Sequence, residues 1–142
     1  MKLVVGITGS TGVIYGIRLL EVLKKLGIET HLVMSEWAQK CITMETEYDP
    51  DYVKSLGTEV SDDVNMAASI SSGTHRTDGM IVIPCSMKTL SSVANGYDET
   101  LVARAAGVML KESRKLILVV RETPLTAINL ENMLKLARLG VV

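Results

Sequence analysis

Short apolar runs alternate along this chain with longer segments of helical spacing. The apolar runs have the length of β-strands and are rich in Val, Ile and Leu; they read KLVVGI, IETHLVM, GMIVIP and KLILVV at residues 2–7, 28–34, 79–84 and 115–120. Such runs, when turn residues bound them, are typical of strands that are buried on both faces of a sheet. The pattern therefore predicts four buried strands.

The segments between these runs predict helices. After the first run, apolar residues recur every three positions at Ile14, Ile17, Leu20, Leu23 and Leu26, which is consistent with one face of a helix. Further helices are predicted at 35–46 with Ser35 as N-cap, in SMKTLSSVANG up to Gly96, at 99–112, and at 126–138 with Gly140 as the C-terminal stop.

Two segments lie outside this alternation. Residues 47–72 are polar and rich in Asp and Ser, and we interpret them mostly as loop. The final Val141 and Val142 look like the first residues of a further strand. Strands that alternate with amphipathic helices predict an open α/β fold with a parallel sheet covered on both faces. A chain of 142 residues is expected to form one domain, residues 1–142.

Composition narrows the classes of function. The net charge is −1 and the pI is near 6.1, so the chain lacks the basic surface that nucleic acid binding needs. No apolar run approaches the roughly 20 residues that span a bilayer, and glycines come too early for a signal peptide, so we expect a soluble, cytoplasmic protein without a membrane partner. Cys41 and Cys85 lack metal-ligand spacing; we expect reduced, buried thiols and no metal.

Two turns carry the features of anion sites. TGSTG, residues 8–12, follows the first strand and opens a helix, where free amides and the helix dipole favour a phosphate. Glycines also occur in such turns for steric reasons, and both interpretations stay open. The glycine spacing does not fit the dinucleotide motif GxGxxG. IPCSMKTL, residues 83–90, places hydroxyls and amides at a second helix N-terminus.

Two charged clusters are less specific on sequence grounds. Ser35 caps a helix or binds a ligand, and Glu45, further along that helix, is by default a solvated carboxylate. Arg104 and Lys111 are seven residues apart, hence on one helix face, and Arg121 with Glu122 follows the last buried strand. Basic residues on a helix usually form a solvated face. If they converge with a carboxylate, they suit a phosphorylated substrate and an acid/base step.

Taken together, four segments resemble the UbiX-type flavin prenyltransferases, a family formerly described as aromatic acid decarboxylase subunits. They read GITGSTGVIYGIRLLE, SSGTHRTDGMIVIPCSMKTLSSVANG, LVARAAGVMLKESRKLILVVRETPL and INLENMLKLARLG and cover nearly the whole chain. The resemblance implies a flavodoxin-like or Rossmann-like three-layer fold. It also implies a homo-oligomer built from trimers, commonly a dodecamer, with FMN bound where subunits meet.

The resemblance further implies a reaction. The family joins a dimethylallyl group from dimethylallyl phosphate to reduced FMN without a metal, and the prenylated FMN then serves a separate UbiD-type decarboxylase. Position by position, the residues that match the family's flavin contacts are Gly9, Ser10, Thr11, Ser35, Ser86, Met87, Lys88, Thr89 and Arg121. The residues that match its prenyl-phosphate and acid/base site are Arg104, Lys111, Arg121, Glu122 and Glu45.

The sequence departs from the family pattern in two places. The family usually has Ala-Ser in the first turn, where this chain has Ser10 and Thr11. The family's C-terminal strand and helix, which carry a tyrosine and a basic residue of the phosphate site, are absent from these residues. We therefore expect flavin binding to be retained better than prenyl transfer. Two alternative functions are a flavin-binding carrier without catalysis and a flavin-dependent cysteine decarboxylase of the same superfamily.

Overall fold

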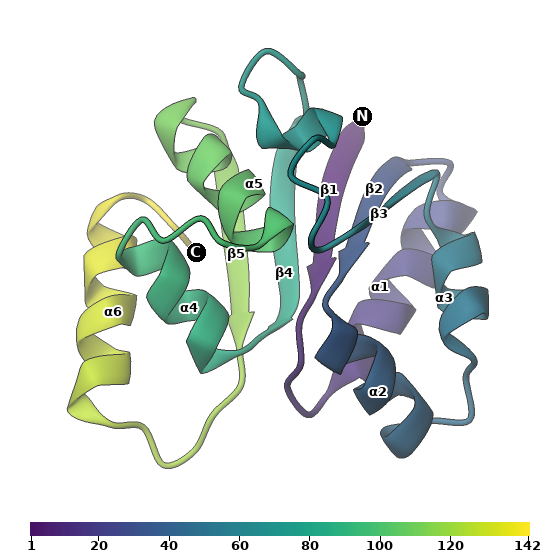
Figure 1. Ribbon diagram of the computed structural model, residues 1–142, viewed down its shortest axis with the longest axis horizontal. Helices are drawn as coiled ribbons and strands as arrows, with labels where there is room; N and C mark the ends of the chain where they lie inside the picture. The colour runs from purple at the N-terminus through teal and green to yellow at the C-terminus, as the bar shows by residue number, and fades with distance from the viewer.

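Five parallel strands form the centre of the molecule in the computed structural model, which describes residues 1–142 (Figure 1). Their order across the sheet is β3-β2-β1-β4-β5. The strands are β1 (Lys2–Ile7), β2 (Glu29–Met34), β3 (Glu59–Asp62), β4 (Gly79–Cys85) and β5 (Lys115–Val120). The order reverses between β1 and β4, as in doubly wound Rossmann-like sheets. The predicted open α/β fold is confirmed, with one strand more than the apolar runs indicated.

Helices cover both faces of this sheet and give three layers (Figure 1). On one face, α1 (Val13–Lys25), α2 (Glu36–Glu45) and α3 (Pro50–Leu56) enclose a core with β1 and β2. On the other face lie a 3₁₀ turn (Ser69–Ser71), α4 (Met87–Ala94) and α5 (Leu101–Lys111), while α6 (Ala127–Arg138) packs mainly against α4. Aliphatic side chains fill both cores, and the sheet separates them.

The predicted helix starts are confirmed by their caps. The Ser35 hydroxyl accepts the Ala38 amide at the start of α2, and Ser86 and Thr126 act in the same way at α4 and α6. Gly140 has a φ of 84°, the left-handed conformation expected of a residue that stops a helix. In α1, the apolar stripe ends earlier than predicted, because Leu26 is 67% exposed.

The interpretation of residues 47–72 as mostly loop is wrong. This segment contains α3 and β3 as well as the 3₁₀ turn. The strand was missed because β3 reads EVSD and lies at the sheet edge, where only β2 pairs with it and none of its side chains is buried. The helix was missed because it is only seven residues long, although Asp49 caps it and Pro50 occupies its first turn.

The last residue pairs with the outer strand. The Val142 amide donates to the Leu116 carbonyl at 3.1 Å, and the Leu118 amide donates to the Val142 carbonyl at 2.8 Å. Alternate bonding of one residue to two residues of its neighbour is the parallel ladder pattern. Residues 141 and 142 are not part of an assigned strand, so the expectation of a further strand stays a prediction that these two bonds support. None of the six α-helices is both long and apolar enough to span a bilayer.

Candidate functional site

The two predicted anion-binding turns, TGSTG after β1 and the IPCSMKTL turn at the end of β4, meet at the carboxyl ends of these strands, where the strand order reverses. Thr8, which is 2% exposed, joins them. Its hydroxyl donates to the Pro84 carbonyl at 2.8 Å and accepts the Ser86 amide at 2.8 Å. In open α/β sheets, ligands bind outside the carboxyl ends of the strands at this switch point. Thr8 therefore holds the two candidate ligand-binding turns side by side. The sequence analysis did not assign this role to it.

The glycine turn has both a steric and a chemical rationale. A Cβ at Gly9 would overlap the Cβ of Trp37, so no larger residue fits without a shift of α2. Gly12 has a φ of 99°, which favours glycine. The amides of Gly9 and Thr11 donate to no acceptor in the chain. The steric interpretation of TGSTG is confirmed, and the free amides are compatible with the anion-binding interpretation, which stays a prediction.

Two side chains from distant parts of the chain reach this turn. Glu45, the last residue of α2, accepts the Gly12 amide with Oε2 at 3.1 Å. The Ser10 hydroxyl donates to the Arg121 carbonyl at 3.3 Å, which brings the segment after β5 to the turn. The side chains of Arg121 and Glu122 are exposed there. Glu45 is therefore a neighbour of the first turn rather than merely a solvated helical carboxylate.

The second turn repeats the design of the first. The Ser86 hydroxyl accepts the Thr89 amide at 3.2 Å and donates to the Thr89 hydroxyl at 3.0 Å, so these two side chains are tied to each other. The amides of Met87 and Lys88, at the start of α4, donate to no acceptor in the chain. Two helix N-termini with free amides thus lie at the carboxyl ends of the strands. This arrangement suits a ligand that has both an anionic group and a polar ring.

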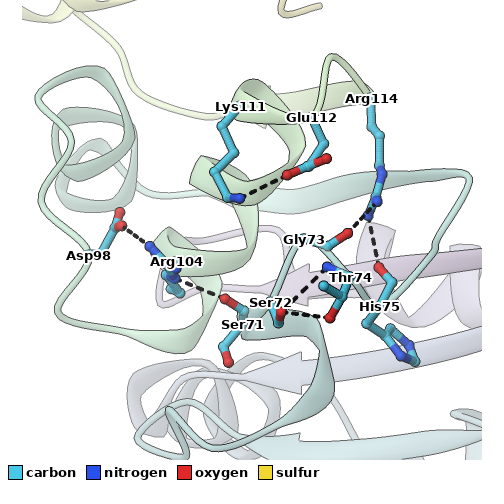
Figure 2. A network of polar contacts seen from close by, with 10 residues as sticks. All are labelled: Ser71, Ser72, Gly73, Thr74, His75, Asp98, Arg104, Lys111, Glu112 and Arg114. Atoms are coloured by element: carbon cyan, nitrogen blue, oxygen red, sulfur yellow. Dashed lines mark hydrogen bonds and ion pairs between the residues drawn. The ribbon is translucent and has the colours of Figure 1, made fainter.

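Arg104 and Lys111 do not join this edge within one chain. Helix α5 runs antiparallel to the strands, so it ends near the start of β5 (Figure 1). Arg104 donates to the Ser71 carbonyl through Nε at 3.0 Å and pairs with Asp98 at 3.1 Å (Figure 2). Lys111 pairs with Glu112 at 2.8 Å. The expected convergence of these cations with Arg121 and Glu122 is therefore wrong for a single chain.

A carboxylate that the sequence analysis missed holds the start of α5. The Leu101 amide donates to the Asp63 carbonyl at 2.7 Å, and the Val102 amide donates to Asp63 Oδ1 at 2.9 Å. Burial raises the pKa of Asp63, while these amides and the charge of Lys88 act in the opposite direction. The signal was weak, because Asp63 lies 38 residues before the helix that it caps.

The sequence predicted two buried thiols, and only one of them is fully buried. Cys85 is fully buried at the end of β4, and burial raises the pKa of its thiol to about 12. Cys41 is half-buried on α2, and its pKa is also raised, mainly by burial. Neither cysteine is bonded to the other. Because the thiolate is the nucleophile, this raised pKa disfavours a nucleophilic role for Cys85 at neutral pH.

The comparisons with known proteins agree with this geometry. The model of the Flavoprotein family matches residues 1–142, which gives the class of protein that the sheet and its two amide-bearing turns define. The chain is 56% identical over 142 residues to a probable UbiX-like flavin prenyltransferase of Streptomyces sp. (strain D7), covering 99% of this chain and 71% of that protein. The chain belongs to the family of UbiX-like flavin prenyltransferases.

Two solved structures are similar over essentially the whole chain. One is a dodecameric FMN-dependent UbiX-like decarboxylase from Escherichia coli O157:H7, with a TM-score of 0.99 and 55% identity, covering 100% of this chain and 78% of that one. The other is AnUbiX (PadA1) in complex with FMN and dimethylallyl pyrophosphate, with a TM-score of 0.98 and 52% identity, covering 99% and 75%. The chain thus spans about three quarters of each of these relatives.

Proposed function

We propose that this enzyme joins a dimethylallyl group from dimethylallyl phosphate to reduced FMN, and that the prenylated FMN serves a UbiD-type decarboxylase. The observation that carries the proposal is the pair of amide-bearing turns that Thr8 joins at the switch point. A 52% identical relative has been solved with FMN and dimethylallyl pyrophosphate, which supports FMN and a phosphorylated dimethylallyl donor as the ligands here. This degree of similarity favours the transferase over the carrier and the cysteine decarboxylase.

The residues at the switch point fit a flavin phosphate. The amides of Gly9 and Thr11 are free to donate, and the helix dipole of α1 favours an anion beside them. We assign the flavin contacts to these turns and to Ser35 and Arg121, so that the bound group spans Gly9, Ser10, Thr11, Ser35, Ser86, Met87, Lys88, Thr89 and Arg121. Reduced FMN, when bound, supplies the ring atoms to which the allyl carbon becomes joined.

The charged side chains supply the rest of the chemistry. An allylic phosphate departs readily only where its growing negative charge is stabilised, and Arg104 and Lys111 are cations suited to that task. Glu122 follows β5 beside the first turn, and we assign it the movement of protons at that edge. Glu45 already accepts the Gly12 amide, so we assign it a second, orienting carboxylate role. No step in this scheme requires a metal.

The separation of Arg104 and Lys111 from the turns supports a site shared between subunits. Within one chain Arg104 bonds to Ser71 and Asp98, and Lys111 pairs with Glu112, so neither cation is bonded to Glu122. We propose that they complete the site of a neighbouring copy in a homo-oligomer built from trimers. One relative of 55% identity forms a dodecamer, which supports an assembly in which different edges of the chain meet.

One assay tests the reaction itself. The purified protein is incubated anaerobically with reduced FMN and dimethylallyl phosphate, and the flavin is then analysed by mass spectrometry. We expect a flavin that has gained one C5H8 unit. A flavin that is retained on the protein without any gain in mass would instead identify the chain as a carrier.

A subunit-mixing experiment tests the shared site. Glu122→Gln and Lys111→Met variants are each expected to be nearly inactive, because each removes one half of every site. When the two are denatured together and refolded as mixed oligomers, some sites receive intact Glu122 and intact Lys111 from different subunits, and activity should return. Mixing without refolding serves as the control. If mixed oligomers form and stay inactive, both residues act within one chain and the shared site is wrong.

We also propose that the enzyme acts in the cytoplasm, without a nucleic acid or membrane partner. The net charge of −1 and the pI near 6.1 support the first of these absences.

A further inference from the structure

The segment from Ser71 to His75 is bonded through its backbone to two arginines of the α5 region (Figure 2). Arg114 donates to the Gly73 carbonyl through Nη2 at 2.7 Å and to the His75 carbonyl through Nη1 at 2.8 Å. Arg104 donates to the Ser71 carbonyl at 3.0 Å. Charged donors make stronger hydrogen bonds than neutral ones, so alternate carbonyls of this turn are firmly held.

The end of α5 directs Arg114 toward this turn. Ser113 has a φ of 53°, and the Arg114 amide donates to the Met109 carbonyl at 2.8 Å. The Ser113 amide also donates to the Leu110 carbonyl at 3.2 Å, which completes the pattern of a Schellman end. The chain therefore reverses directly after α5, and the half-buried guanidinium lies between α5 and the turn. Its position is fixed by backbone geometry and by two carbonyls together.

Gly73 lies in the turn that Arg114 holds, and it is also in contact with the Lys111 side chain. A Cβ at Gly73 would lie 2.9 Å from Lys111 Nζ and even closer to the Glu112 carboxylate, so the ion pair packs directly on the glycine. The turn and the ion pair border a hollow of about 520 Å³, which is lined by Ser72, Gly73, Thr74, Arg76, Lys111, Glu112 and Arg114. Any movement of Gly73 would therefore change the space that the Lys111 ammonium occupies.

We propose that Arg114 is a positioning residue for Lys111: by holding the Gly73 and His75 carbonyls, it fixes the surface on which the Lys111–Glu112 pair rests. The inference rests on the proposed function, in which Lys111 receives the donor phosphate. Arg114 is suited to this task because a planar guanidinium donates to two acceptors at fixed directions, whereas a lysine ammonium does not. Charge alone at this position is therefore insufficient.

The test compares Arg114→Lys with the wild type in a state that cannot react. Protein loaded with oxidised FMN is titrated with dimethylallyl phosphate by calorimetry, and amide hydrogen exchange is followed over residues 71–76. We expect the substitution to weaken donor binding about tenfold and to speed exchange in the turn. The affinity for FMN should stay as in the wild type, because the assigned flavin contacts within the same chain lie at the opposite end of the strands. The oligomeric state, measured by native mass spectrometry, should also stay unchanged.

Two further variants keep the outcome interpretable. Arg138→Lys on α6 is the matched control, since Arg138 is exposed and makes no hydrogen bond or ion pair in the chain, and it should change neither reading. Gly73→Ala moves the ion pair without touching Arg114 and should also weaken donor binding. Unchanged donor affinity or unchanged exchange in Arg114→Lys overturns the inference. If wild-type protein binds no dimethylallyl phosphate, the proposed function fails. The exchange measurement then still tests whether Arg114 holds the turn.

Discussion

The two ends of the parallel sheet present different chemical groups. At the carboxyl ends of the strands, the turns after β1 and β4 present backbone amides that have no acceptor in the chain. At the other end, Arg114 and the Lys111–Glu112 pair gather around the turn before β4, and the arginine is bonded to backbone carbonyls. One end thus combines free peptide amides with the side chains of Glu45, Arg121 and Glu122, whereas the other end holds an ion pair and an arginine bonded to carbonyls.

This difference motivates the proposal of a site shared between subunits. Fixed amides and a helix dipole at the carboxyl ends of the strands suit a flavin phosphate. Within one chain, Arg104 bonds to Ser71 and Asp98, and Lys111 pairs with Glu112, so neither is bonded to the glycine turn. In the proposed oligomer, a neighbouring copy supplies these cations. The predictions below test each end separately.

The largest expected effect is on catalysis at the carboxyl ends of the strands. Glu122→Gln keeps the shape of the side chain and removes its ability to take up a proton, so prenyl transfer should slow by about 100-fold or more. Binding of FMN, measured by equilibrium ultrafiltration, should stay within twofold. Glu131→Gln, an exposed change on α6, is the control. Equal losses of transfer and of FMN binding would show that Glu122 is structural.

A change in the glycine turn should affect both stability and flavin binding. Gly9→Ala places a methyl group against Trp37 Cβ, and such overpacking typically costs about 1–3 kcal/mol. Denaturant unfolding should show this loss, and FMN affinity should fall with it because the turn must move. Ser10→Ala, which adds no atoms and removes the hydroxyl's bond to the Arg121 carbonyl, should lower the free energy of unfolding by less. Wild-type stability in Gly9→Ala would show that α2 adjusts freely.

The bridge between the two turns should respond to loss of one hydroxyl. Thr8→Val leaves the part-buried Ser86 amide without its acceptor, and full burial of such an unsatisfied group costs about 1–3 kcal/mol, so we expect a loss toward the lower end of this range. Thr8→Ser retains the hydroxyl and should recover most of the loss. Thr43→Val, at an exposed hydroxyl that bonds only within its own helix, is the matched control in the same unfolding assay. If Thr8→Val and Thr43→Val unfold alike, Thr8 does not join the turns.

The smallest effect concerns pH at the opposite end of the sheet. Burial lowers the pKa of His31, with Lys2 and His75 acting in the same direction and Glu59 against them. The folded state therefore binds fewer protons than the unfolded state, in which a histidine has a pKa of about 6.5. Stability should be complete above pH 6.5 and fall as the pH is lowered below it.

The comparison for this prediction is His31→Gln. The variant has no imidazole at this position, so its free energy of unfolding should depend less on pH between about 6.5 and 5. Denaturant unfolding at several pH values measures the slope. Glu59 titrates below this window, since Lys2 lowers its pKa, and does not interfere. Equal slopes in both proteins would assign the pH dependence to other groups.

Much of this architecture could be predicted from the chain because the strands are buried and the helices are capped. The runs at 2–7 and 115–120 coincide with β1 and β5, and Ser35 caps α2 as expected. The edge strand β3 escaped prediction because pairing at an edge leaves no apolar pattern. Periodicity reports burial, so an element without burial gives no signal.

The site was predictable in its parts and not in its arrangement. Helical spacing correctly placed Arg104 and Lys111 on one helix, but it contains no information on which end of the sheet that helix points toward. The Glu45 contact with Gly12 joins positions 33 residues apart and depends on how α2 packs beside the first turn. The bridging role of Thr8 likewise required β1 and β4 to be known as neighbours.

The packing of Trp37 against Gly9 provides an optical reporter of the site. Trp37 is the only tryptophan of the chain, it is 62% exposed, and Lys40 lies 4.8 Å from its ring. An isoalloxazine bound near the glycine turn would quench the indole's fluorescence, because the excited indole transfers its energy to the flavin without emission. Intrinsic fluorescence therefore follows occupancy of this one pocket without any added label, and every subunit of an assembly reports for itself.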